Sequence, residues 1–147
     1  MELRTAASPK DVKYYTTERL REEFLIDDLF KADDIKLVYS HIDRIITGSA
    51  VPVKGALKLT AGDELRAEYF LQRREMGVIN IGGTGFINID GKKYTVGYKD
   101  AMYIGMGSKD ITFESEDAGK PAKFYINSAP AHKTYPTVLI KLDGEPE

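Results

Sequence analysis

The sequence contains no cysteine and only two histidines in 147 residues. Without cysteine, the chain can form no disulfide and can offer no thiolate to a metal ion. Two histidines by themselves fall short of the three or four protein ligands that a zinc site requires. We therefore expect no metal-binding residues in this chain.

Long hydrophobic runs are also missing, because no stretch approaches the roughly 18 apolar residues that a membrane-spanning helix needs. Residues 1–15 lack the apolar segment of a secretory signal. The net charge of −2 gives no electrostatic reason to bind nucleic acid or an anionic membrane surface. These absences favour a cytoplasmic protein without nucleic-acid or membrane partners.

Glycine, in contrast, is frequent: thirteen are present, and most fall between short runs with a two-residue period. Turn signals recur about every 8–12 residues, which is typical of an all-β sandwich or barrel. A chain of 147 residues fits one domain. We predict an irregular segment over 1–16, a β-barrel domain with a leading helix over 17–142, and a polar tail over 143–147.

The leading helix is predicted over 17–24, where Leu20, Phe24 and Leu25 share one face at helical spacing and Thr17 can cap the N-terminus. Farther along, Asp90-Gly91 separates two alternating runs, which predicts a two-residue type I′ hairpin. Alternation elsewhere brings the total to about nine or ten strands, among them 55–60 and 66–75.

The order of these glycine-rich hairpins resembles the cupin superfamily, with motifs at "EMGVINIGGTGFINIDG" and "YKDAMYIGMGSKD". The resemblance implies a double-stranded β-helix, or jelly-roll, barrel. It places Glu75 at the cupin glutamate position, but Tyr69, Leu71 and Asp110 stand where metal-binding histidines are expected. A transition metal at the usual cupin site is therefore not expected here.

Longer words resemble a narrower family: "YSHIDRII" (39–46), "FLQRREMGVINIGG" (70–83) and "PAKFYINSAPAHKTYPT" (121–137) are similar to the N-terminal half of the 5-keto-4-deoxyuronate isomerases. The resemblance implies interconversion of 5-dehydro-4-deoxy-D-glucuronate and 3-deoxy-D-glycero-2,5-hexodiulosonate during pectin breakdown. It also implies a small uronate substrate, a homo-oligomer, and zinc held by the C-terminal half of the parent enzyme. We expect this chain, which ends before that half, to be inactive alone.

His41 and Asp43 are candidate catalytic residues. On a strand, positions i and i+2 share a face, so the carboxylate could orient the imidazole as a general base. The alternative is a structural histidine at a domain or subunit interface. His132, in a proline-flanked loop, is interpreted as structural.

Candidate substrate-binding residues occur in "QRRE", where Arg73 and Arg74 are predicted on opposite faces of a strand, with Glu75 on the same face as Arg73. A guanidinium can bind a uronate carboxylate with two hydrogen bonds. The alternative is a Glu–Arg pair at a barrel end or subunit contact.

Lys123, Tyr125 and Asn127 form a second candidate group, since they alternate along one strand. Such a polar row could line the barrel mouth or a partner's cleft. Two functions of other classes therefore remain open beside the isomerase half: a metal-free cupin that binds sugar acids, and an oligomerisation domain.

Overall fold

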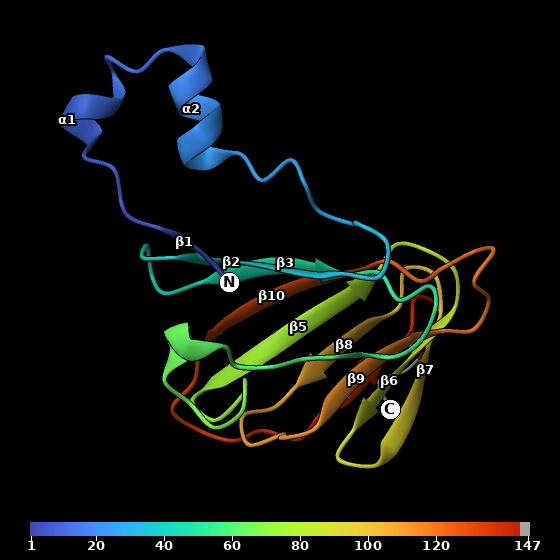
Figure 1. Ribbon diagram of the computed structural model, residues 1–147. Helices are drawn as coiled ribbons and strands as arrows, with labels where there is room; N and C mark the ends of the chain where they lie inside the picture. The colour runs from blue at the N-terminus through green and yellow to red at the C-terminus, as the bar shows by residue number, and fades with distance from the viewer. Residues whose placement is uncertain (145–147) are drawn as a thin grey trace.

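Two β-sheets face each other across one hydrophobic core in the computed structural model, which describes residues 1–144 (Figure 1). The larger sheet has seven strands in the order β1-β2-β3-β10-β5-β8-β11, and the smaller has four in the order β4-β9-β6-β7. In chain order the strands are β1 (Glu2–Arg4), β2 (Ile35–Ser40), β3 (Ile46–Ala50), β4 (Leu57–Lys58), β5 (Arg74–Asn80), β6 (Gly85–Ile89), β7 (Lys92–Val96), β8 (Ala101–Ile104), β9 (Ile111–Ser115), β10 (Phe124–Pro130) and β11 (Val138–Ile140). Neighbouring strands are antiparallel, except that β1 runs parallel to β2.

The space between the sheets is filled by alternate residues of the strands. Along β5, Met76 and Val78 point inward and are almost fully buried, whereas Ile79 points outward and is 44% exposed. Phe113 of β9 and Phe124 of β10 meet in the interior with their ring centroids 5.3 Å apart. The interior is therefore a packed apolar core, as the alternation of the sequence predicts.

An N-terminal arm carries the two α-helices, α1 (Pro9–Val12) and α2 (Thr17–Phe24), and Figure 1 shows both standing apart from the sheets. The predicted helix over 17–24 is confirmed. Its cap is the neighbouring residue, because the Thr16 side chain accepts a hydrogen bond from the backbone N–H of Arg19 at 3.3 Å, and Thr17 is the first helical residue. No residue of α2 is buried.

The prediction that residues 1–16 are irregular is wrong, since they contain strand β1 and helix α1. Strand β1 has little pattern of its own, and it forms because β2 offers it an unpaired edge. At the other end of the chain, Asp143 and Gly144 of the predicted tail follow β11 in a turn, while 145–147 lie outside the described residues.

The predicted strand over 66–75 is also largely wrong. Turns and bends follow the short 3₁₀ helix η1 (Asp63–Leu65), and the strand begins only at Arg74. The consecutive residues Phe70 and Leu71 are both buried, which a regular strand with alternating faces does not permit. The predicted strand over 55–60 is shortened to β4.

The predicted hairpin at Asp90-Gly91 is confirmed. Both residues have positive φ, 49° and 86°, as a type I′ turn requires. Ile89 and Lys92 form the last pair of the β6–β7 ladder beside this turn. Among residues 1–144, no helix is long and apolar enough to cross a membrane.

Candidate functional site

Three arginines gather in a cleft of about 190 Å³ at one end of the larger sheet. We call it the arginine cleft, and its lining residues are Tyr39, Arg44, Glu64, Leu65, Ala67, Phe70, Arg73, Arg74 and Pro130. They come from β2, the β2–β3 turn, the loop around η1, the start of β5 and the end of β10. The cleft therefore forms only in the folded chain.

Arg74, the first residue of β5, anchors the cleft with a side chain that is only 6% exposed. Its Nε donates to the hydroxyl of Ser128 at 3.1 Å, and its Nη2 donates to the carbonyls of Ser128, at 2.9 Å, and Arg44. The guanidinium also lies over the Tyr39 ring, 5.7 Å from its centroid. These contacts fix the orientation of the group but supply no formal negative charge.

Burial lowers the pKa of the Arg74 guanidinium; the Tyr39 phenol acts in the opposite direction and the positive charge of Arg44 lowers the pKa further. An arginine still remains charged at neutral pH. Arg74 is therefore a permanent, largely desolvated cation at the wall of the cleft.

Arg73 lies in the bend before β5 and is exposed. Its Nη2 donates to the carbonyls of Leu65 and Arg66, each at 3.0 Å. The prediction that Arg73 and Arg74 point to opposite faces of a strand is wrong, because the strand has not begun at Arg73 and both side chains line the same cleft. Glu75 points instead to the outer face of the sheet, where it accepts a hydrogen bond from the Tyr103 hydroxyl at 2.7 Å.

His41 and Asp43 do not lie on a strand. Strand β2 ends at Ser40, and residues 41–44 form the turn that leads into β3. The His41 ring contacts the Tyr39 ring edge-to-face, with the ring centroids 5.3 Å apart. Within the described part of the chain, no hydrogen bond joins His41 to Asp43. The predicted orientation of His41 by Asp43 is therefore wrong.

Lys123, Tyr125 and Asn127 lie outside the core. Tyr125 and Asn127 face outward from β10, and the Asn127 amide donates to the Thr47 hydroxyl at 3.4 Å. Lys123 precedes the strand and lines a separate shallow hollow beside Tyr98. The predicted row does not line a barrel mouth. His132 is exposed in the loop that follows β10.

The positions that correspond to the cupin metal site lie in different environments. Leu71 is fully buried in the core, and Asp110 is exposed and pairs with the Lys58 ammonium at 2.9 Å, which lowers the pKa of its carboxyl. Tyr69 lies in the bends before β5. Among residues 1–144, no group of three His, Cys, Asp or Glu side chains could hold a metal ion. The residues present do not fit the zinc that the family resemblance implies.

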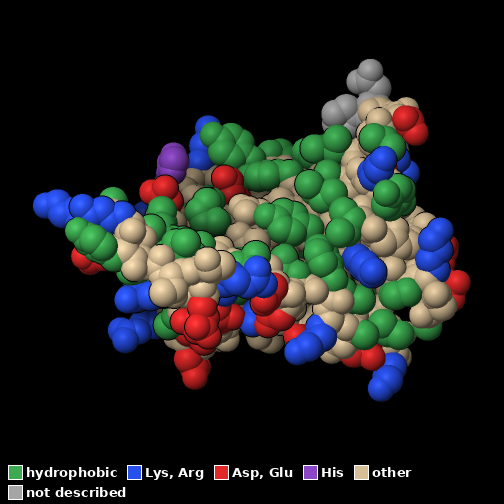
Figure 2. Space-filling model, turned by 90° about the horizontal axis from the view of Figure 1, so that it is seen from above, with side chains coloured by type: hydrophobic (Ala, Val, Ile, Leu, Met, Phe, Trp, Pro, Cys, Tyr) green, Lys and Arg blue, Asp and Glu red, His purple; other side chains and the backbone are tan. Residues whose placement is uncertain are grey.

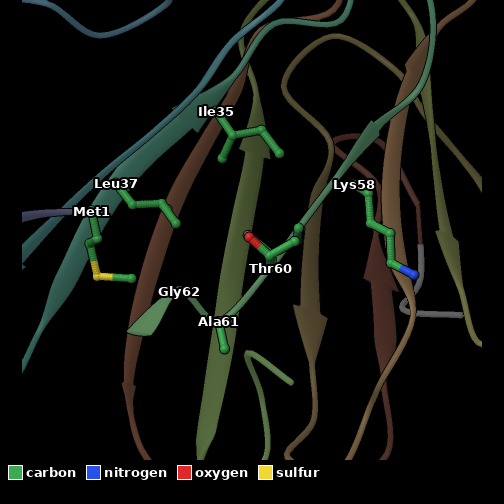
Figure 3. Close-up of a pocket in the computed structure, with 8 residues that line it drawn as sticks. Met1, Ile35, Leu37, Lys58, Thr60, Ala61 and Gly62 are labelled. Atoms are coloured by element: carbon green, nitrogen blue, oxygen red, sulfur yellow. The ribbon is translucent and has the colours of Figure 1, made fainter. Parts of the chain in front are cut away.

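A smaller hollow of about 140 Å³ opens where the segment 58–62 crosses the larger sheet (Figure 3). Figure 3 shows Met1, Ile35 and Leu37 lining it opposite that segment. Its walls combine apolar side chains with Lys58 and Thr60, and the Met1 amine pairs with Glu64 at 3.0 Å. This hollow brings together no acid, base or cation cluster of the kind seen in the arginine cleft.

Sequence reasoning missed three residues near these candidates: Tyr39, Arg44 and Tyr103. Arg44 was visible inside "YSHIDRII", but only the folded turn brings it to Arg74. Tyr103 joins Glu75 across β8 and β5, a pairing that lies 28 residues apart in sequence. A contact between such distant residues leaves no short-range pattern.

Comparisons with solved structures support the fold. A TM-score of 0.50 relates the chain to the cupin domain of Cnp3 from Schizosaccharomyces pombe, at 7% identity over 66% of this chain and 64% of that one. The same score relates it to a cupin domain of an XRE-family transcriptional regulator from Enterobacter cloacae, at 16% identity over 67% of this chain and 97% of that one. The fold is cupin-like, although the two sheets are not hydrogen-bonded into a closed barrel among residues 1–144.

Curated relatives are far more similar in sequence. The 4-deoxy-L-threo-5-hexosulose-uronate ketol-isomerase of Lachnoclostridium phytofermentans is 82% identical over 141 residues, which are 96% of this chain and 51% of the relative. The protein of the same name from Lachnospira eligens is 63% identical, over 95% of this chain and 50% of the relative. The chain thus spans about half the length of the curated relatives it matches. The KduI/IolB family model matches residues 25–146, and the chain belongs to this family.

Proposed function

We propose that this chain provides the N-terminal half of a 4-deoxy-L-threo-5-hexosulose-uronate ketol-isomerase. The observation that carries the proposal is the 82% identity to the Lachnoclostridium phytofermentans protein of that name, over about half of its length. The reaction interconverts 5-dehydro-4-deoxy-D-glucuronate and 3-deoxy-D-glycero-2,5-hexodiulosonate in the cytoplasm.

In this proposal the described domain is a scaffold and the zinc chemistry belongs to the other half of the parent enzyme. An aldose–ketose isomerisation benefits from a metal that polarises the carbonyl and hydroxyl oxygens, and such a metal needs three or four ligands with an open position. The core of this domain is apolar and its two histidines lie on exposed loops, which supports a structural role. The chain by itself is inactive.

A chimera tests the assignment. In the Lachnoclostridium phytofermentans protein, the half that matches this chain is replaced by this chain, and isomerase turnover is measured. We expect a rate within about tenfold of the parent, a change of roughly 1.4 kcal/mol in the barrier, because the exchanged segments are 82% identical.

This chain alone is the matched control, and it should bind no stoichiometric zinc and show no turnover. A correctly folded chimera without activity would contradict the proposal. Turnover by the chain alone, with stoichiometric zinc, would contradict the division of roles between the two halves.

A further inference from the structure

The arginine cleft carries more positive charge than its own residues neutralise. Among residues 1–144, no carboxylate lies within ion-pairing distance of Arg44, Arg73 or Arg74. The acidic residue in the lining, Glu64, already pairs with the Met1 amine at 3.0 Å. An anion would find two or three guanidinium groups with free donors.

The structure holds two of these three cations in place before any ligand arrives. Arg74 is fixed by the three hydrogen bonds to Ser128 and Arg44, and Arg73 by its two bonds to Leu65, the last residue of η1, and to Arg66, which follows it. Burying a charge without a counter-charge raises the free energy of the folded state, because the charge loses its hydration. A bound anion would offset this desolvation penalty at Arg74. Preorganised donors also lose little conformational entropy on binding.

The rest of the lining suits a small acid that also bears hydroxyl groups. Leu65 and Pro130 offer apolar surface to carbon-bound hydrogens, while the Tyr39 hydroxyl and the Glu64 carboxylate are hydrogen-bonding groups. A guanidinium matches the planar carboxylate with two parallel hydrogen bonds. The volume of about 190 Å³ lies below the roughly 300–1,000 Å³ typical of drug-sized ligands, so the occupant must be small.

We propose that the arginine cleft is a binding site for a small hydroxylated carboxylate of sugar-acid size. The site lies wholly within the described domain and is independent of the zinc chemistry of the other half. Binding can therefore be measured on this chain alone, and its outcome does not depend on the isomerase assignment.

The test is a titration of this chain with D-glucuronate, followed by NMR chemical shifts. D-Glucose serves as the uncharged counterpart, and inorganic phosphate as an anion of different shape. We expect saturable shifts with glucuronate, centred on residues that line the cleft and weakened at high salt because the attraction is partly electrostatic. Glucose should produce no saturable shift.

Two variants localise the site. Arg44→Gln removes an exposed cation whose side chain makes no hydrogen bond to any other part of residues 1–144, and we expect glucuronate affinity to fall about tenfold or more. Arg66→Gln is the matched control, since Arg66 carries the same charge in the neighbouring loop but does not line the cleft. Arg73→Gln is a second variant, should Arg44→Gln disturb the turn.

Equal binding of glucose and glucuronate, or no binding of either, would overturn the proposal. Stronger binding of phosphate than of glucuronate would overturn the choice of a carboxylate. Equal losses in Arg44→Gln and Arg66→Gln would mean that only the net charge of this end of the molecule matters, which would overturn the site itself.

Discussion

The Tyr103 hydroxyl and the Glu75 carboxylate meet on the outer face of the larger sheet, 2.7 Å apart. Burial, together with the hydrogen bond to Glu75 and the negative charge of that carboxylate, raises the pKa of Tyr103 to about 12. Removing the phenolic proton would leave two anions facing each other on adjacent strands. This pair therefore favours the protonated phenol over a wide range of pH.

The consequence for stability appears at alkaline pH. The folded pKa of Tyr103, about 12, lies above its ordinary value of 10.0, so the unfolded chain loses this proton first. The contribution to the free energy of unfolding is fully present below pH 10 and is lost as the pH rises toward 12. We expect ultraviolet titration to show one tyrosine ionising late, with a lower pKa in Glu75→Gln.

Tyr103→Phe is the control for this titration, because it should remove the late ionisation and flatten the extra loss of stability between pH 10 and pH 12. If the late-ionising tyrosine persists in Tyr103→Phe, the assignment to this residue is wrong.

The residues of the candidate site show which features a sequence can reveal. The arginines of "QRRE" were recognised as candidates because adjacent guanidiniums are a local feature. The turn at 41–44 was not recognised, because Asp43 and Arg44 adopt positive φ, 54° and 55°, without the glycine that usually marks such a turn. With the turn missed, His41 was assigned to a strand and Arg44 was not connected to Arg74.

At the scale of the elements, the sequence predicts correctly those helices and turns whose structure depends only on residues that are close together in the chain. The helix over 17–24 and the hairpin at Asp90-Gly91 were predicted because capping and turn residues act within a few positions. Strand β1 and the bends before β5 depend on partners distant in sequence, which no local period records. The sequence therefore predicted the fold class better than the path of the chain into the arginine cleft.

The β6–β7 hairpin offers a test of this local control. Gly91 has a φ of 86°, and a Cβ added there would meet nothing within 4 Å, so only the backbone conformation opposes a side chain. We expect Gly91→Ala to lower the free energy of unfolding by about 1–2 kcal/mol. Urea unfolding measures this change.

Gly55→Ala is the matched control, because a Cβ at Gly55 also meets nothing within 4 Å and the residue does not adopt a left-handed φ. There we expect no loss, and a gain of about 0.4–1 kcal/mol from the restricted unfolded chain. Equal effects at the two positions would contradict the type I′ interpretation.

At the scale of the whole molecule, the N-terminal arm leaves hydrophobic side chains uncovered. Tyr14, Leu20 and Phe24 are 77%, 37% and 52% exposed. Polar contacts hold the arm at its ends, since Lys36 pairs with Asp28 at 2.7 Å and its pKa is raised by that partner and by Glu2. The arm is thus anchored to the domain while these hydrophobic side chains remain exposed.

The larger sheet also exposes apolar residues on its outer face, where Ile79 and Ile140 are each 44% exposed. Figure 2 shows hydrophobic side chains gathered over much of the face seen from above. In a two-fold dimer, the arm of each copy would pack against the apolar outer face of the larger sheet of the other copy, so that both exposed apolar surfaces become covered. A homo-oligomer is therefore the assembly that we expect.

The arm provides the test of this assembly. Leu20→Glu combined with Phe24→Glu should lower the molar mass in light scattering from an oligomer to a monomer, because charged side chains would enter an apolar contact. The unfolding temperature of the monomer should scarcely change, since neither residue is buried within the chain. Arg21→Glu, on the same helix and with the same total change of charge as the double variant, should leave the mass unchanged unless charge alone governs association. A wild-type monomer, or a double variant that keeps the oligomeric mass, would mean that the exposed side of the arm does not join copies of this chain.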